Sequence, residues 1–567
     1  MDLQPKRTAE GAKPVRPRMI ALLGVCTLLS ATQAAAAQEA ADRAADAESA
    51  LHTEYLVEMR DGVKLATSVY LPPGDGPWPV VLQRTPYNKA GGAQMQKRYT
   101  DSGYAFAIQD QRGRFRSDGV YSAHENELED GYDTVEWIAQ QRWSNGRVGV
   151  SGTSAVGIAA NLAAASNPPH LRAAYVTVAP RSNLYEARFI NGLFKEADTG
   201  NWMRGQGVSE EEVNLYKKRV VEDQRWRDTD LIFHRHRIDI PIYNAGGWYD
   251  LFSYGTVMNF QYLQNWGLEG AKGNQKMLVG PVGHGALRGD LEYPDAPTGL
   301  GDLGGDEELR WFDYWLKDID NGIMREPPVR YYMMASARRG SPSSNNGWRT
   351  ADEWPPTEST RTPFYLHADG SLSRTAPADG MASTSYRFDP SDPVPTLGGL
   401  NLTLPIGPMD QREIGDRTDY LRFESAPLEE PLAIAGKIDL DLCAATDGLD
   451  TDFIVKLVDV YPDGYEALVL DTGIRTRYRN GQRLESIEMM TPGEPTRMTV
   501  DMWNSAITFD PGHRIAVHVT SSNYPRFEVN TNTGDPAGEA IQEQRVATNT
   551  VFHGADCSTS IALPVLP

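Results

Sequence analysis

The sequence predicts a mixed α/β domain built on a mostly parallel sheet, a helical segment inserted into it, and an all-β domain at the C-terminal end. Three observations support this prediction. Short apolar runs alternate with helical patterns over residues 53–180 and again over 240–325, as in parallel strands joined by helices. Residues 181–239 are rich in charged and aromatic side chains and lack strand alternation. Residues 326–567 consist of short β-prone runs separated by Pro, Gly and Asp.

The first part of the α/β domain has a regular order of elements. Two strands are expected on either side of a turn at Asp61-Gly62, at residues 54–59 and 64–71. The elements expected after them are strands at 79–83 and 104–109, a helix over 130–141, a strand before Ser154 and a strand at 173–178. Alternation of this kind is typical of a sheet with helices on both faces.

The same alternation resumes after the inserted segment. Strands are expected at 240–244 and 276–280, and a helix over 307–318 closes the domain. We interpret residues 181–239 as a helical cap over the active site of the α/β domain. The C-terminal domain, residues 326–567, is expected to be a β-sandwich of the jelly-roll type. Its predicted strands are 329–334, 438–442, 453–460, 514–519 and 560–564.

Length and charge limit the classes of function. A chain of 567 residues is too long for one hydrophobic core, so two or three domains are expected. The formal net charge is −21, and removal of residues 1–37, with five basic and two acidic side chains, takes it to about −24. This excess of negative charge argues against nucleic acid or an anionic membrane as a partner. The sequence does not determine the oligomeric state, and a homo-oligomer is compatible with it.

The N-terminus has the pattern of an export signal. A basic region precedes a short apolar core at 19–31, and Ala34-Ala-Ala-Ala37 offers a cleavage site before Gln38. Cleavage at residue 37 predicts a periplasmic or secreted protein with no membrane segment, and residues 38–52 are expected to be a linker. An uncleaved anchor is the alternative.

Two cysteines remain after cleavage, Cys443 and Cys557. An exported compartment permits a disulfide, and both lie in the C-terminal third of the chain, so we expect them to pair. Two buried free cysteines are the alternative.

Residues 147–157 have the pattern of a strand, a tight turn and a helix. An apolar run leads into Gly152-x-Ser154-x-x-Gly157, and an alanine-rich helical stretch follows. A serine at the apex of such a turn is exposed, and the next backbone amide points to where an oxyanion would form. We therefore interpret Ser154 as the nucleophile of an α/β-hydrolase. The alternative is a serine that caps a helix N-terminus.

A base and an acid are expected after Ser154, because the order in this fold is nucleophile, acid, histidine. His284 follows the strand expected at 276–280 in a tight loop, and Asp250 follows the preceding strand and a Gly-Gly turn. The acid would orient the imidazole and stabilise the imidazolium. The alternative for His284 is a structural loop histidine, and the alternative for Asp250 is a helix N-cap. Asp239 is a weaker candidate for the acid, because it precedes its strand.

The oxyanion needs two donors. One is expected to be the backbone amide of Ala155. The other is expected in the loop after the strand at 79–83, where Tyr87 supplies a phenol hydroxyl.

No cofactor and no metal site is predicted. His234 and His236 have a spacing that two metal ligands can have, but no third ligand has recognisable spacing. A solvated polar face is the interpretation that we favour.

With these residues assembled, the chain resembles the family that joins cocaine esterase, the α-amino-acid ester hydrolases, glutaryl-type cephalosporin acylases and the X-Pro dipeptidyl-peptidases. The likeness runs from about Thr53 to the C-terminus. The matching stretches are Arg84-Thr-Pro-Tyr87, Gln109-Asp-Gln-Arg-Gly-Arg, Gly152-x-Ser154-x-x-Gly157, Gly247-Trp-Tyr-Asp250, Gly280-Pro-x-x-His284, Asp450-Thr-Asp-Phe-x-x-Lys-Leu-Val-Asp-Val-Tyr-Pro-Asp463 and Ser521-Ser-Asn-Tyr-Pro-Arg-Phe527.

The resemblance implies a hydrolase domain, a helical cap and a jelly roll, with Ser154, Asp250 and His284 as the triad and Tyr87 with the Ala155 amide as oxyanion donors. Two departures stand out. The family usually has Tyr after the nucleophile, where this chain has Ala155. The α-amino-acid ester hydrolases carry acidic residues just after the catalytic Asp, where this chain has Leu251-Phe-Ser. An acyl group that is uncharged or differently charged is therefore expected.

The predicted function is that of a serine esterase or amide acylase acting on a small-molecule substrate through an acyl-enzyme. An X-Pro dipeptidyl-peptidase is one alternative, and it needs an anion for the peptide amine, for which the cap offers Glu186, Glu196 and Asp198. An α-amino-acid ester hydrolase is a second alternative. A non-catalytic binding protein is a third, and the intact set of catalytic positions speaks against it.

Overall fold

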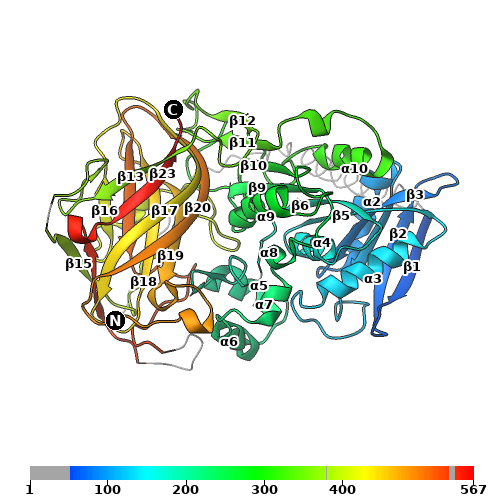
Figure 1. The fold of residues 1–567 in the computed structure, drawn as a ribbon, viewed down its shortest axis with the longest axis horizontal. Coiled ribbons are helices and arrows are strands. Elements are labelled where there is room, and N and C mark those ends of the chain that lie inside the picture. The colour runs from blue at the N-terminus through cyan, green and yellow to red at the C-terminus, as the bar shows by residue number, and fades with distance from the viewer. Residues whose placement is uncertain (1–50, 183, 379, 536–542) are drawn as a thin grey trace, which may run out of the picture.

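A computed structural model describes residues 51–182, 184–378, 380–535 and 543–567. The predicted export signal and most of the predicted linker lie outside these residues. Figure 1 shows the α/β part beside the C-terminal β part, with the short helices α5 to α7 at the junction between them. Within the described ranges, none of the helices has the length and apolar character needed to cross a membrane.

The α/β part is built on one sheet of ten strands in the order β1-β2-β4-β3-β5-β6-β9-β10-β11-β12. Neighbours from β4 to β11 in this order are parallel, whereas β1, β2 and β12 are antiparallel to their neighbours. The strands are β1 Leu51–Glu58, β2 Lys64–Leu71, β3 Trp78–Thr85, β4 Ala105–Asp110, β5 Ser144–Thr153, β6 Leu171–Thr177, β9 Ile242–Tyr249, β10 Lys276–Gly283, β11 Val329–Met333 and β12 Gly347–Ala351. The predicted mostly parallel sheet is confirmed.

Helices cover both faces of this sheet. On one face, α3, α4 and α9 share a hydrophobic cluster with the strands, and on the other face α2 and α10 contribute the aromatic side chains Tyr99, Trp311 and Phe312. The helices are α2 Gly92–Thr100, α3 Glu127–Ala139, α4 Ala155–Ala165, α9 Ser253–Trp266 and α10 Glu307–Lys317. Burial of apolar surface on both faces explains why the central strands are apolar along their whole length.

One sequence assignment is corrected by the sheet. The strand predicted at 329–334 exists as β11, but it lies in neither sheet of the sandwich, because it pairs in parallel with β10, and β12 pairs with it in turn. The chain runs from β10 through α10 to β11, which is the crossover that two parallel neighbours require. A short apolar run carries no information about its partner strand, so the sequence placed it in the wrong sheet.

The inserted segment is less regular than a helical cap. It holds a two-stranded hairpin, a single π-helical turn and four short helices around a small core of its own, in which Phe194, Met203 and Trp226 are buried. The elements are β7 Phe189–Ile190, β8 Leu193–Phe194, the π turn Glu196–Gly200, α5 Asn201–Gly205, α6 Glu210–Lys218, α7 Gln224–Asp228 and α8 Leu231–His234. The C-terminal domain also holds it, since backbone amides of Ala197 and Glu222 donate across the boundary to carbonyls of that domain.

The C-terminal domain has two antiparallel sheets that share one hydrophobic cluster, so the predicted sandwich is confirmed. The larger sheet holds β13 Thr360–Leu366, β14 Leu372–Ser373, β15 Ser383–Phe388, β17 Leu432–Thr446, β20 Thr496–Phe509, β22 Ala547–Phe552 and β23 Ser560–Val565. The smaller sheet holds β16 Leu421–Glu424, β18 Asp452–Val460, β19 Glu466–Arg475 and β21 Arg514–Thr520. Its assignment to the jelly-roll type stays a prediction.

A disulfide joins Cys443 on β17 to Cys557 in a short turn before β23, with the two Cα atoms 5.7 Å apart. The pairing expected from the sequence is confirmed. Both cysteines are buried and pack against Phe552.

Candidate active site

Ser154 lies at the turn between β5 and α4. Its backbone has φ 60° and ψ −125°, a conformation that non-glycine residues rarely adopt. The strand and the helix meet so closely here that a Cβ on Gly152 would lie 2.4 Å from the backbone of Val156, and one on Gly157 would lie 3.0 Å from the Gly152 carbonyl oxygen. A side chain at 152 would clash with the backbone, and one at 157 would be tightly crowded, which explains the spacing Gly152-x-Ser154-x-x-Gly157. The turn predicted from this motif is present.

The structure brings together the three side chains that the sequence singled out. His284 Nε2 lies 2.7 Å from the Ser154 Oγ, and His284 Nδ1 lies 2.7 Å from the Asp250 Oδ2. The three residues follow β5, β9 and β10, which are parallel strands of one sheet. Because parallel strands end at the same edge of a sheet, residues 34 and 130 positions from His284 along the chain meet there.

The acid and the imidazole are held in place by their surroundings. Asp250 is fully buried, and its second carboxylate oxygen accepts a hydrogen bond of 2.7 Å from the Phe252 amide. The Phe252 ring packs edge-on against the imidazole, with ring centroids 5.7 Å apart. A fixed carboxylate on Nδ1 makes Nδ1 the protonated nitrogen and leaves the lone pair of Nε2 facing the serine hydroxyl.

The other candidates lie elsewhere. Asp239 precedes β9 and accepts from the Gly270 amide at 2.6 Å, so it is at the opposite end of the strand from Asp250. His234 is buried and bonds the Asp228 carbonyl oxygen at 3.0 Å, whereas His236 is exposed. Over the residues that the structure describes, no group of three or more His, Cys, Asp or Glu side chains has a metal-binding arrangement.

Of the two predicted oxyanion donors, Ala155 follows Ser154 and lines the same cavity, and Tyr87 contacts Trp202, which also lines it. Ala155 is the first residue of α4, so its amide has no partner inside the helix. The Tyr87 hydroxyl accepts a hydrogen bond of 2.9 Å from the Trp202 indole, which leaves its own proton free to donate. Burial raises the pKa of the Tyr87 phenol, so the hydroxyl keeps this proton at neutral pH.

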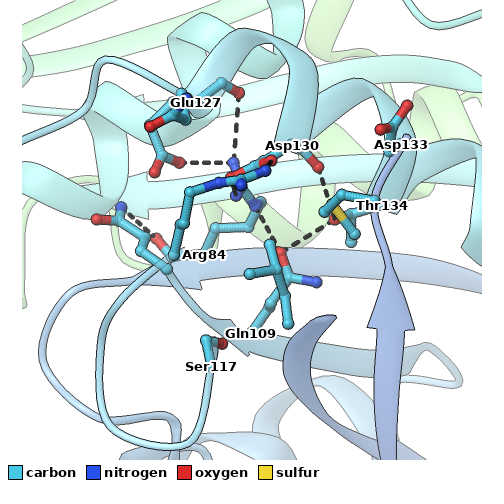
Figure 2. A network of polar contacts seen from close by, with 12 residues as sticks. Arg84, Gln109, Ser117, Glu127, Asp130, Asp133 and Thr134 are labelled. Atoms are coloured by element: carbon cyan, nitrogen blue, oxygen red, sulfur yellow. Dashed lines mark hydrogen bonds and ion pairs between the residues drawn. The ribbon is translucent and has the colours of Figure 1, made fainter. Parts of the chain in front are cut away.

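A buried polar network anchors the loop that carries Tyr87. Figure 2 shows the Arg84 guanidinium between Glu127 and Gln109. Its Nη1 lies 2.5 Å from the Glu127 carboxylate, and its Nε donates to the Gln109 side chain at 2.7 Å. Thr134 donates to the same Gln109 oxygen at 3.0 Å. The network joins the carboxyl ends of β3 and β4 to α3, which fixes the start of the Tyr87 loop and accounts for two of the recognised sequence motifs.

A second contact ties this loop to the inserted segment. Arg114 donates to the Pro86 carbonyl at 3.0 Å and to the Gln206 side chain at 2.8 Å. Gln206 directly follows α5, the helix that carries Trp202. Loop and inserted segment are thus linked by Arg114 as well as by the contact between Trp202 and Tyr87.

We expect Tyr87→Phe to lower kcat by about 10²-fold while changing KM much less, because the donor acts on charge that develops only in the transition state. Steady-state kinetics with an activated ester check this. Tyr132→Phe is the matched control, since Tyr132 lies on α3, away from the cavity lining. An unchanged kcat would remove Tyr87 from the mechanism.

A cavity opens beside Ser154. Its lining comes from the α/β domain, the inserted segment and, through Leu402, the C-terminal domain. The lining residues are His124, Ser154, Ala155, Ile158, Ala187, Arg188, Thr199, Trp202, Leu251, Phe252 and Leu402. The sequence gave no role to His124 or Arg188. His124 precedes Ser154, so the order rule removed it, and Arg188 is one of many charged residues in the cap, with no spacing that marks it.

Comparison with known proteins places this geometry in a wider group. A family model described as X-Pro dipeptidyl-peptidase (S15 family) matches residues 61–219, and one described as the X-Pro dipeptidyl-peptidase C-terminal non-catalytic domain matches residues 321–562. The first match includes Tyr87 and Ser154, whereas Asp250 and His284 lie beyond it.

Relatives match over almost the whole length. Cocaine esterase of Rhodococcus sp. (strain MB1 Bresler) is 30% identical over 590 aligned positions, which cover 92% of this chain and 99% of that protein. The crystal structure of an aminopeptidase from the marine sediment archaeon Thaumarchaeota archaeon has a TM-score of 0.77 at 26% identity, covering 91% of this chain and 97% of the other. An α-amino acid ester hydrolase structure has a TM-score of 0.75 at 25% identity, covering 91% and 96%.

Proposed function

The chain belongs to the serine-hydrolase family of cocaine esterase and the X-Pro dipeptidyl-peptidases, and we propose that it is an esterase or acylase acting on small acyl substrates. The single observation that carries this proposal is the continuous chain of hydrogen bonds from Asp250 through His284 to the Ser154 hydroxyl. The proposal includes export of the enzyme, which rests on the sequence pattern of residues 1–37.

The chemistry follows from the positions of these groups. Ser154 Oγ attacks the scissile carbonyl carbon while His284 Nε2 takes its proton, and Asp250 stabilises the imidazolium that forms. The carbonyl oxygen becomes an oxyanion held by the Ala155 amide and the Tyr87 hydroxyl. Collapse of this intermediate expels the leaving group, to which His284 returns the proton, and an acyl-enzyme remains. Water, deprotonated by the same nitrogen, then releases the acid and restores the serine.

The acids that a dipeptidyl-peptidase would use to bind a peptide amine are already engaged elsewhere. Glu196 pairs with Arg204 at 2.9 Å and with Lys217 at 2.7 Å. Burial raises the pKa of the Glu186 carboxyl to about 8, and both of its oxygens accept backbone amides. Asp198 is buried and accepts from the Leu402 amide. None of these carboxylates lines the cavity at Ser154, which favours the esterase or acylase over the dipeptidyl-peptidase.

Two chromogenic anilides that share the same leaving group distinguish the esterase or acylase from the dipeptidyl-peptidase. We expect 4-nitrophenyl hexanoate to be turned over, and hexanoyl 4-nitroanilide to be cleaved faster than Ala-Pro 4-nitroanilide, because no anion in the cavity holds the free amine. The measured quantity is kcat/KM for each compound. Faster cleavage of the Ala-Pro anilide would replace the proposal by the dipeptidyl-peptidase.

A further inference from the structure

The cavity at Ser154 contains a buried cation with no anion beside it. Arg188 lines the cavity and is only 4% exposed. Across the described ranges, its guanidinium makes no side-chain hydrogen bond or ion pair, and its Nε is buried without a partner. Burial of an unpaired charge destabilises the folded state, so a buried guanidinium is normally paired with an anion.

The neighbours of Arg188 do not neutralise it. Its guanidinium packs over the rings of Trp202 and Tyr216, at 5.6 and 5.7 Å from their centroids. Glu125 is the acid whose charge acts on Arg188, and it already bonds Arg219 at 3.4 Å. The other groups that act on it are the phenols Tyr121 and Tyr216 and the Arg219 cation, and no carboxylate lines the cavity. The site is therefore electropositive.

A second unpartnered polar group lies in the same lining. His124 is buried, and neither of its ring nitrogens has a hydrogen-bond partner. Its ring is nearly parallel to the Trp202 indole, with centroids 6.1 Å apart, and the Arg188 guanidinium packs over the same indole. Burial and the neighbouring cations lower the pKa of His124 to about 3, so the ring is neutral and offers one donor nitrogen.

We propose that the substrate of this site carries an anionic group, a carboxylate at the far end of a short acyl chain, which binds Arg188 and accepts a hydrogen bond from His124. This inference rests on the proposed function, because it assigns the acyl group of the same reaction. A carboxylate satisfies the guanidinium through charge-assisted hydrogen bonds, whereas an ammonium group is repelled and a neutral chain leaves the charge unpaired.

The cavity indicates that the anion belongs to the acyl group. Ser154, Ala155 and Ile158 of α4 line it together with Arg188. The acyl group stays on the serine after the leaving group departs, so it occupies the cavity that Arg188 shares with the nucleophile.

Three 4-nitrophenyl esters of equal chain length test the proposal with the unaltered protein at neutral pH: the monoester of adipic acid, the hexanoate and the 6-aminohexanoate. The acyl ends are then negative, neutral and positive. We expect kcat/KM for the adipate monoester to exceed that for the hexanoate by at least about tenfold, and the 6-aminohexanoate to be the poorest substrate. Equal values for adipate and hexanoate, or a preference for the ammonium ester, would overturn the proposal.

Variants assign the preference to one side chain. Arg188→Gln is expected to reduce kcat/KM for the adipate monoester at least about tenfold more than for the hexanoate, and Arg188→Lys to retain part of the preference. Arg225→Gln is the matched control, because Arg225 lies on α7 of the same inserted segment and outside the cavity lining. An equal loss on all three esters in Arg188→Gln would contradict a binding role.

A measurement on the unaltered protein tests the proposal even if Arg188→Gln does not fold. Adipate is expected to slow the labelling of Ser154 by a fluorophosphonate in the unaltered protein at concentrations where hexanoate does not. Equal protection by the two acids would overturn the proposal. The label also separates the two proposals, since absence of labelling at Ser154 refutes the serine hydrolase, whereas labelling without protection by adipate refutes only the anion site.

Discussion

Replacing Ser154 by alanine is expected to lower kcat by about 10⁴-fold or more, and to abolish labelling by a fluorophosphonate. The reason is the single path for covalent chemistry in this site. His284 Nε2 lies 2.7 Å from the Ser154 Oγ, so without that oxygen the base has no nucleophile to activate. Steady-state turnover of a 4-nitrophenyl ester and mass spectrometry of the labelled peptide are the two measurements.

A serine on the same helix provides the control. Ser166 follows the last turn of α4, and its hydroxyl donates to the Ala163 carbonyl at 2.8 Å. Ser166→Ala is expected to keep both turnover and labelling. A Ser154→Ala variant that retained more than about 10% of kcat would mean that another group carries the reaction.

The sequence predicted the nucleophile turn well because its causes are local. The closeness of strand and helix requires glycine at 152 and favours it at 157, and both positions lie in a stretch of six residues. The acid and the base were also predictable, because each follows a strand and the order of the three residues is fixed by the topology of the sheet. Coordinates were needed only to show that Asp250, and not Asp239, faces the imidazole.

Long-range pairing was not predictable in the same way. The apolar run of β11 suits either a central parallel strand or a strand of the sandwich, and only its register with β10 decides between the two. The strand at 329–334 was therefore assigned to the sandwich, and β12 was not foreseen. The inserted segment was predicted as helical, yet its hairpin of β7 and β8 holds only two residues in each strand, too few for a period to show.

The cavity lining was the least predictable part of the site. It joins His124 from the loop before α3, Arg188 and Trp202 from the inserted segment, and Leu402 from the loops of the C-terminal domain. No motif connects these segments, because their meeting depends on how the inserted segment is held between the other two parts. The sequence did show that acids are absent after Asp250, and the unpaired Arg188 gives that absence a physical meaning.

Asp250→Asn is expected to reduce kcat by about 10⁴-fold with little change in the fold. The asparagine Oδ1 can still accept the Phe252 amide, as the carboxylate does at 2.7 Å. Its amide group then faces His284 Nδ1 as a donor, which makes Nδ1 an acceptor and moves the ring proton to Nε2. A protonated Nε2 cannot take the proton of Ser154, so the serine stays inert although the three residues remain in contact.

Asp239→Asn tests whether this loss is specific. Asp239 was the other candidate acid, and its Oδ1 accepts the Gly270 amide at 2.6 Å, a contact that asparagine keeps. This variant is expected to retain its kcat. Asp250→Asn should recover part of its rate as the pH rises, because hydroxide can then take the serine proton in place of the imidazole. An Asp250→Asn enzyme with a rate close to that of the unaltered protein would show that the imidazole is oriented by some other contact.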